Sequence, residues 1–201
     1  MTLLSSRPLH QDTRERILAT GESLIAGRGF SALGLSEILG AAEVPKGSFY
    51  HYFQSKEGFG VAMLERYFAD YQSRLTALFG DNRLSAQQRL LTYFQNWQTT
   101  TESSECHKLC LAVKLAAEVA DLSEPMRVAL AVGMNGITAQ IANVVRTAQS
   151  EGSISDKLNA DEVAESLYSM WVGASLLTKV NRQMRPLQLA FRQTKALLQS
   201  S

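Results

Sequence analysis

Apolar residues recur at helical spacing along almost the whole chain, and no stretch shows the alternation of apolar and polar residues typical of a strand. The pattern therefore predicts an all-α protein of about nine helices, a small group in front and a larger bundle behind. We expect helical segments at residues 12–29, 35–42, 46–53, 55–79, 85–103, 109–122, 123–150, 161–182 and 186–200.

Residues that suit helix ends mark several of these boundaries. Ser55 and Ser123 are expected to cap the helices that follow them, because a serine hydroxyl accepts a hydrogen bond from the first free N–H groups of a helix. Asp12 or Thr13 is expected to do the same for the first helix, which leaves the first ten residues as a loose tail. Gly27 and Gly29 can end that helix, since glycine tolerates a positive φ.

The most specific pattern lies at residues 34–56, which read as two short helices joined by a tight turn and followed by the start of a third. The turn is Glu43-Val44-Pro45, and Phe49 and Phe53 face the core from the second short helix. Such a unit can place one helix in the major groove of DNA while its flanks hold phosphates. We therefore expect a helix-turn-helix DNA-binding domain at residues 11–71 and a helical regulatory and dimerisation domain at residues 72–201.

The polar residues of this unit each suit a contact with DNA. Lys46 can reach a base edge or a phosphate, and Gly47 lets the backbone come close to the groove. Lys56 begins the following helix, where its ammonium and the helix dipole together attract a phosphate. The residues expected to contact DNA are Ser36, Lys46, Gly47, Ser48, Tyr50, His51, Tyr52 and Lys56. Aromatic residues at this spacing also build ordinary cores, so the pattern alone leaves that reading open.

Charge does not by itself indicate a nucleic-acid binder. The formal net charge is +1, and over residues 1–56 six Lys and Arg stand against five acids, 6 − 5 = +1. Affinity for DNA must then come from where the charges lie and from the use of two copies.

The ordered string Val44-Pro45-Lys46-Gly47-Ser48-Phe49-Tyr50-His51-Tyr52-Phe53, followed by Ser55-Lys56-Glu57, resembles the DNA-binding signature of the TetR/AcrR family. The resemblance implies a three-helix DNA-binding head on a helical ligand-binding body that acts as a homodimer, usually a repressor. Two heads roughly 34 Å apart, one turn of DNA, would read a palindromic operator. The chain departs from the family pattern at Leu33-Gly34, often Thr-Thr, at Glu43, usually Gly, and at Pro45, commonly Ser.

A thin polar stripe crosses an apolar segment of the body. Cys106, Cys110 and Lys114 recur every four residues, so they share one helix face with Glu118. A thiol near lysines at a helix start ionises more readily and can react with electrophiles or oxidants. The alternative is that these cysteines are buried as small apolar residues.

Segments 110–119, 121–127 and 171–174 of the body, with segment 42–65 of the head, resemble electrophile-responsive repressors that control N-ethylmaleimide reductase. This resemblance implies that Cys110 matches the reactive cysteine of that group. Lys179, a polar residue in an apolar helix, is a candidate partner for Cys110, or a lysine whose stem lies along apolar surface while its amine reaches water.

The residues give weaker support to three other functions. A metal site built on Cys106, His107 and Cys110 lacks a fourth ligand, and an enzyme using Cys110 and His107 lacks an orienting acid and an oxyanion hole. A helical interaction module that does not bind DNA also remains open. We expect no enzyme activity, no metal and no cofactor; the expected partners are double-stranded DNA, an inducing small molecule or electrophile, and a second copy of the chain.

The last two helices carry apolar stripes that predict a four-helix dimer interface, with ordinary core packing as the alternative for each position. The stripe residues are Leu167, Met170, Trp171, Ala174, Leu177, Leu187, Phe191, Leu197 and Leu198. No apolar run approaches the roughly 18 to 20 residues needed to cross a bilayer, and the first ten residues lack a signal peptide's apolar stretch. With 2 cysteines and no secretory signal, we expect free thiols, a cytoplasmic location and no membrane partner.

Overall fold

The computed structural model describes residues 9–103 and 111–199, and every regular element in them is a helix, which confirms the predicted all-α fold. The helices are α1 (Leu9–Arg28), α2 (Leu35–Ala42), α3 (Lys46–Phe53), α4 (Lys56–Phe79), α5 (Ala86–Glu102), α6 (Leu111–Val119), α7 (Glu124–Ser150), α8 (Ala160–Asn181) and α9 (Arg185–Leu198).

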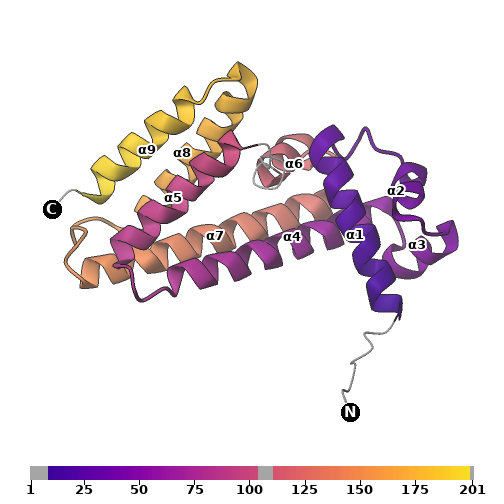
Figure 1. Ribbon diagram of the computed structural model, residues 1–201, viewed down its shortest axis with the longest axis horizontal. Coiled ribbons are helices and arrows are strands. Elements are labelled where there is room, and N and C mark those ends of the chain that lie inside the picture. The colour runs from indigo at the N-terminus through magenta and orange to yellow at the C-terminus, as the bar shows by residue number, and fades with distance from the viewer. Residues whose placement is uncertain (1–8, 104–110, 200–201) are drawn as a thin grey trace, which may run out of the picture.

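Helices α1, α2 and α3 gather at one end of the molecule and form the head with the first turns of α4 (Figure 1). Three aromatic rings fill its core: Phe49 lies 5.2 Å from Phe53 and 5.8 Å from Phe59, between ring centroids. Gly21 of α1 makes room for them, because a Cβ there would lie 2.3 Å from the Phe59 ring. Burying Phe49 and Phe53 fixes which face of α3 turns inward.

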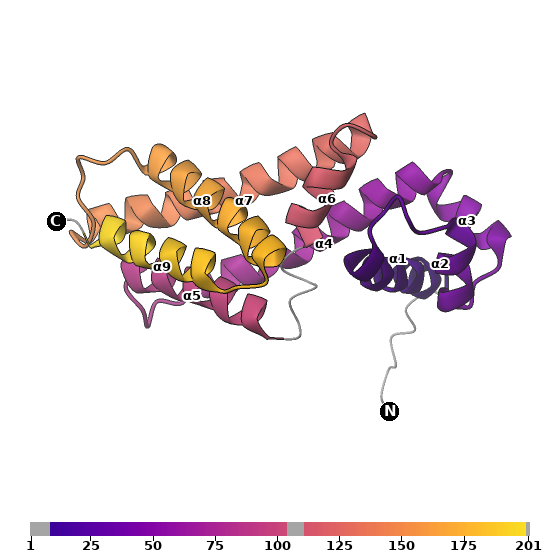
Figure 2. The same cartoon turned by 90° about the horizontal axis from the view of Figure 1, so that it is seen from above.

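Helix α4 leaves the head and runs beside α7 along the length of the body, as both views show (Figures 1 and 2). Gly133 of α7 permits this close packing, since a Cβ there would lie 2.2 Å from the ring of Phe68 on α4. The expected boundary between residues 71 and 72 falls inside α4, which both parts share. Any movement of α4 therefore acts on head and body together.

The body core is built around two tryptophans whose indole N–H groups are satisfied. Trp97 of α5 donates to Ser175 of α8 at 2.9 Å, and Trp171 of α8 donates to Thr194 of α9 at 2.9 Å. Phe94 stacks on Trp171 with ring centroids 5.0 Å apart. These contacts hold α5, α8 and α9 together at the end of the molecule away from the head (Figure 1).

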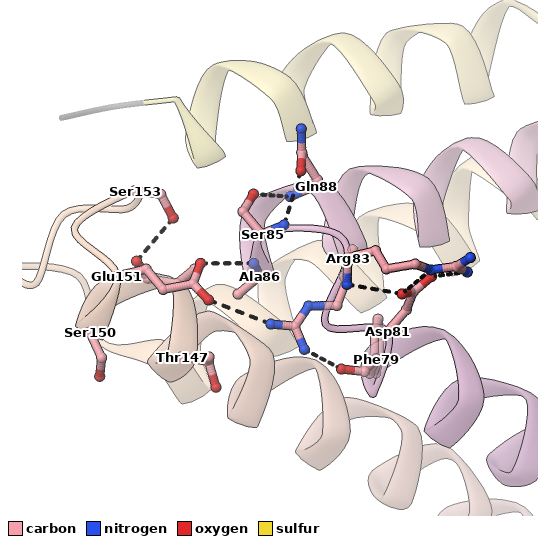
Figure 3. Close-up of polar contacts among 12 residues, drawn as sticks. Phe79, Asp81, Arg83, Ser85, Ala86, Gln88, Thr147, Ser150, Glu151 and Ser153 are labelled. Atoms are coloured by element: carbon pink, nitrogen blue, oxygen red, sulfur yellow. Dashed lines mark hydrogen bonds and ion pairs between the residues drawn. The ribbon is translucent and has the colours of Figure 1, made fainter.

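At the turn between α4 and α5, side chains satisfy the free N–H groups at the start of α5 (Figure 3). Ser85 accepts from the backbone N–H of Gln88 at 3.2 Å, which makes it the N-cap. Glu151, just after α7, accepts from the N–H of Ala86 at 2.8 Å and lies 3.5 Å from the guanidinium of Arg89. The ends of α5 and α7 are thereby joined.

Helix α7, with 27 residues, is the one described helix long and apolar enough to cross a membrane by length and composition, a candidate that the search for uninterrupted apolar runs missed. Its apolar residues are used within the protein, because α7 packs against α4, α5, α6 and α8. Met126, Leu130, Ile137 and Ile141 are buried there. We interpret α7 as a core helix.

Most predicted helix ends are confirmed, but the predicted start of the first helix is wrong. Ser55 and Ser123 are the N-caps of α4 and α7, and Gly29, with φ +97°, follows α1. Helix α1 begins at Leu9, so Asp12 and Thr13 lie inside it and do not cap it. No Gly or Pro at residues 9–12 stops the helix from extending by one more turn.

Candidate DNA-binding surface and regulatory joint

The turn between α2 and α3 has the sharp geometry of a helix-turn-helix. Glu43 adopts a left-handed conformation with φ 53°, which explains why glycine is usual at that position of the motif. The N–H of Glu43 bonds to the carbonyl of Gly40 at 3.2 Å, and that of Val44 to the carbonyl of Leu39 at 3.0 Å. These bonds end α2 and set the direction in which α3 begins.

Helix α3 presents a polar edge on the side opposite its buried phenylalanines. Lys46, Gly47, Tyr50 and His51 are exposed, while Ser48 is half-buried. Tyr50 keeps 48% of its surface accessible although its ring touches Phe49 edge-on at 5.6 Å. Tyr52 is half-buried, and its ring lies 4.9 Å from that of His51.

Gly47, like Gly27 and Gly40, is a glycine of the head that no close packing contact explains. A Cβ on Gly21, Gly58 or Gly60 would collide with neighbouring atoms at 2.8 Å or less, so packing within the protein explains each of them. A Cβ on Gly47 would meet nothing within 4 Å. No contact with the described residues accounts for glycine at the start of α3.

Ser36 lies exposed in the first turn of α2, beside an arrangement that holds the N-terminus of that helix. Glu37 accepts from the N–H of Gly34 at 2.9 Å and pairs with Arg28 at 2.8 Å. The backbone bond from Gly34, then the hydrogen bond from Arg28, lower the pKa of Glu37. Gly34 has no side chain for capping, so Glu37 supplies that function from inside the helix.

Lys56 has a role within the protein that the sequence did not indicate. Its ammonium donates to the carbonyl of Phe30 at 2.8 Å and lies 4.7 Å from the centre of the Phe30 ring. The side chain is half-buried. Lys56 therefore holds the segment after α1 against the start of α4. It is also the residue that is expected to contact a DNA phosphate.

Two polar side chains of α6 bind the head at the end of α1. Lys114 donates to the carbonyl of Ala26 at 2.9 Å, and Glu118 accepts from the N–H groups of Phe30 at 3.0 Å and Ser31 at 2.6 Å. The two residues share one face of α6, as predicted, and α6 lies beside α1 (Figure 1). We call this set of contacts, Lys114 and Glu118 with Ala26, Phe30 and Ser31, the joint.

Electrostatics favours the charged form of Glu118 in the joint. Burial alone raises its pKa, but the backbone hydrogen bonds from Ser31 and Phe30 outweigh burial and leave the pKa below its usual 4.5. Burial first, and then the positive charge of Lys179, lower the pKa of Lys114 from its usual 10.5. The joint is thus a charged contact between body and head in partly desolvated surroundings.

Lys114 and Lys179 come together at one cavity of about 460 Å³, between the end of α1, the start of α6 and the end of α8. Arg182, the C-cap of α8, lines the same cavity. Sequence reasoning missed Arg182, although its spacing of three from Lys179 places both on one helix face. Cys110 and Cys106, the expected sensing residues, lie outside the described residues, so their role stays a prediction.

The residues of the predicted stripes divide between the two alternatives, core packing and exposed surface. Leu167, Trp171 and Leu187 have at most 1% of their surface accessible, because they fill the core between α5, α8 and α9. Leu177 alone of the predicted set is fully on the surface, with 52% accessible. The exposed apolar residues of α8 and α9 are Leu176, Leu177, Val180 and Leu189.

Comparison with known sequences matches both parts of the chain. Residues 17–63 match the family described as bacterial regulatory proteins, tetR family, and residues 86–194 match the tetracyclin repressor-like C-terminal domain. The chain is 44% identical over 189 residues to the HTH-type transcriptional repressor NemR of Escherichia coli (strain K12), which covers 93% of this chain and 94% of the relative. It is 32% identical to the HTH-type transcriptional repressor DhaR of Mycobacterium sp. (strain GP1), covering 87% and 86%.

Solved structures agree with the sequences. The crystal structure of the reduced form of E. coli NemR superposes with a TM-score of 0.88 at 44% identity, covering 93% of this chain and 97% of the other. A TetR regulatory protein from Rhodobacter sphaeroides gives a TM-score of 0.82 at 31% identity, covering 90% and 96%. The relatives are named as regulators rather than enzymes. With the helix-turn-helix geometry of α2 and α3, these matches show that the chain belongs to the TetR family of bacterial transcriptional regulators.

Proposed function

We propose that the protein is a cytoplasmic, homodimeric repressor that binds a palindromic operator and is released when an electrophile or oxidant modifies its body. The observation that carries DNA binding is the polar edge of α3. Lys46, Gly47 and Tyr50 are exposed there, while Phe49 and Phe53 anchor the opposite face. A helix held rigidly from behind and polar in front suits the major groove.

Gly47 supports this assignment independently of charge. A Cβ here would meet nothing within 4 Å, as at Gly27 and Gly40, so it is the place of Gly47 on the exposed edge of α3 that leaves its backbone open to a partner. A missing Cβ at the start of the recognition helix permits close approach to the sugar-phosphate backbone. Lys46 and Ser48 on either side, with His51 and Tyr52 one turn later, then lie within reach of the same duplex.

Exposed apolar residues support the dimer. Leu177 and Val180 of α8 have 52% and 69% of their surface accessible, and Leu189 of α9 has 40%. Apolar residues that remain on the surface of α8 and α9 favour burial against a second copy. An isologous pairing of these helices gives two heads related by a two-fold axis, which matches a palindrome.

Release requires a connection between body and head, and the hydrogen bonds of the joint support such a connection. Cys110 directly precedes the described part of α6, Leu111–Val119, in the sequence, and Lys114 and Glu118 of that helix hold the end of α1. A covalent change at Cys110, in which Cys106 or Lys179 takes part, then acts on α6 through the residue that precedes Leu111 in the sequence. Release then needs only a few kcal/mol of difference between two arrangements of the heads.

Cys110→Ser tests the release step. The variant is expected to bind the operator as tightly as the unsubstituted protein and to remain bound after brief treatment with N-ethylmaleimide, measured by gel shift. Mass spectrometry of the treated protein should place the added mass on Cys110, and the same treatment of Cys106→Ser measures whether Cys106 takes part in release. Normal release of Cys110→Ser would show that this thiol is not the switch.

DNA binding is tested separately by gel shifts at several salt concentrations. Affinity carried by phosphate contacts falls steeply as salt rises, because binding releases condensed counterions. An affinity for DNA that does not change with salt concentration, or no binding to any genomic fragment, would instead favour a helical interaction module.

The cavity beside the joint favours a second candidate for release, a reversible ligand with Cys110 only structural. At about 460 Å³ it is large enough for a small organic molecule. An unmodified Cys110 in protein that nevertheless releases DNA would favour this candidate.

A further inference from the structure

The cavity beside the joint gathers three cations, none of which forms an ion pair with a described residue. Lys114, Lys179 and Arg182 all line it. The ion pairs found in residues 9–103 and 111–199 include none of the three. The joint carboxylate of Glu118 bonds to the backbone N–H groups of Phe30 and Ser31 instead.

Cations at this place also have an ordinary explanation, because α1 and α8 both end there. The C-terminus of a helix carries a partial charge of about −0.5, so the two ends together supply about −1. Three cations supply +3. Helix α5 also ends beside the cavity, at Thr101 and Glu102, and the carboxylate of Glu118 acts on Lys114, so helix ends and Glu118 offset most of this charge and leave a small positive excess for an anionic ligand.

A buried hydroxyl adds a second, independent observation. Thr178 lines the cavity with 7% of its surface accessible, and its Oγ1 has no hydrogen-bond partner in the described part of the chain. Ser175, one turn earlier on α8, accepts from Trp97 and donates to the carbonyl of Trp171. Buried hydroxyls are normally satisfied in this way, so Thr178 stands as a donor that a ligand oxygen can use.

The remaining walls are suited to a short apolar chain. Ala26 and Gly27 line the cavity on the side of α1, and Met184 lines it after α8. A methionine side chain adapts to ligands of different shape. We propose that the cavity binds a small organic carboxylate, with its charged end between Lys114, Lys179, Arg182 and the Thr178 hydroxyl and its apolar end toward Ala26 and Met184.

The position of Lys114 gives such a ligand an effect on the head. Its ammonium donates to the carbonyl of Ala26 in the unliganded protein. A carboxylate is a stronger acceptor than a peptide carbonyl, so the ligand competes with Ala26 for this ammonium. Loss of that bond frees the last turn of α1 from α6 and favours the arrangement of heads that binds DNA less well. This step rests on the proposed repressor function, whereas the binding site itself does not.

Calorimetric titration of the full-length protein with hexanoate and with its uncharged counterpart hexanamide tests the site without DNA. Hexanoate is expected to bind at least tenfold more tightly than hexanamide. Lys179 and Arg182 are exposed, so we expect the fold to tolerate a substitution at either. Lys179→Gln and Arg182→Gln should each weaken hexanoate binding severalfold. Arg185→Gln removes the same charge three residues further on, outside the cavity lining, and should leave binding unchanged.

Thr178→Val separates the hydroxyl from the charges. It keeps the shape of the side chain and removes a hydroxyl without a partner, so hexanoate binding should weaken while the melting temperature stays equal or rises. Equal binding of hexanoate and hexanamide, no measurable binding of either, or the same loss of affinity in Arg185→Gln would overturn the proposal.

Operator binding in the presence of hexanoate tests the coupling through Lys114. Hexanoate is expected to lower operator affinity severalfold, and hexanamide is not. If hexanoate binds by calorimetry and operator affinity does not change, the coupling is wrong and the carboxylate site stands. If the protein binds no operator under any condition, the proposed repressor function fails and the calorimetric result still decides the site.

Discussion

Replacing Gly47 by alanine should raise the stability of the protein and lower its affinity for DNA. Glycine inside a helix is less favourable than alanine, and nothing within 4 Å would obstruct a methyl group at this position. Stability alone would therefore favour alanine. The same holds for Gly40 of α2, so it is the place of Gly47 on the exposed edge of α3, not the open space alone, that points to close approach by a partner.

Gly47→Ala is expected to raise the stability of the protein by roughly 0.5 kcal/mol and to lower operator affinity at least tenfold. Thermal unfolding and gel shifts on the same preparation measure the two effects. Gly40→Ala is the matched control, because a Cβ on Gly40 of α2 also meets nothing within 4 Å. It should stabilise the protein similarly and leave operator affinity unchanged. Full operator affinity in Gly47→Ala would show that the backbone there stays clear of DNA.

Single residues also show what sequence can and cannot indicate. The exposed edge at Lys46 and Tyr50 was predictable, because Phe49 and Phe53 at a spacing of four define the opposite face. The intramolecular bond of Lys56 was not, because its acceptor, the carbonyl of Phe30, belongs to a segment 26 residues earlier.

At the scale of elements, the value of α6 to the molecule lies in the joint. Glu118 reaches residues 88 and 87 positions away in sequence. Local patterns place helix ends well, as at Ser55 and Ser123, because a cap involves neighbouring residues only. They carry no information about which helix end a distant carboxylate will meet, so the joint appeared only in the structure.

Glu118→Gln is expected to lower the free energy of unfolding by roughly 1 kcal/mol at neutral pH, because an amide oxygen replaces a charged acceptor of two N–H groups. The folded protein holds the pKa of Glu118 below its usual 4.5, so its stabilising contribution is complete above that pH and is lost as the pH falls through the folded value.

Urea unfolding of both proteins across the pH range checks this prediction. The difference between them should be constant above pH 4.5 and shrink below it. Asp121→Asn, an exposed acid just after α6, is the control and should show no such difference. A difference that persists unchanged into acid would mean that the charge of Glu118 does not hold the joint.

At the scale of the whole molecule, the exposed apolar residues of α8 and α9 should decide whether two heads act together. Val180→Asp places a charge on a side chain with 69% of its surface accessible in the protomer, so the protomer fold should persist. The dimer is expected to dissociate at least a hundredfold more readily, by analytical ultracentrifugation, because an unpaired charge in an apolar interface is costly. Operator affinity should fall with it.

Val132→Asp on α7 is the matched control, with 67% of the valine surface accessible. It should leave both the dimer and operator binding unchanged. Dissociation by Val132→Asp rather than by Val180→Asp would move the interface from α8 to α7.

The claim on which the rest depends is that two copies of the edge of α3 beginning at Lys46 meet one duplex. Selection of bound fragments from a random DNA pool, sequenced after several rounds, tests it most directly. The account predicts a palindrome whose half-sites are spaced by about one helical turn, and the loss of that enrichment in Lys46→Ala. Enrichment of no sequence, or of a single asymmetric site that Lys46→Ala selects equally well, would contradict it.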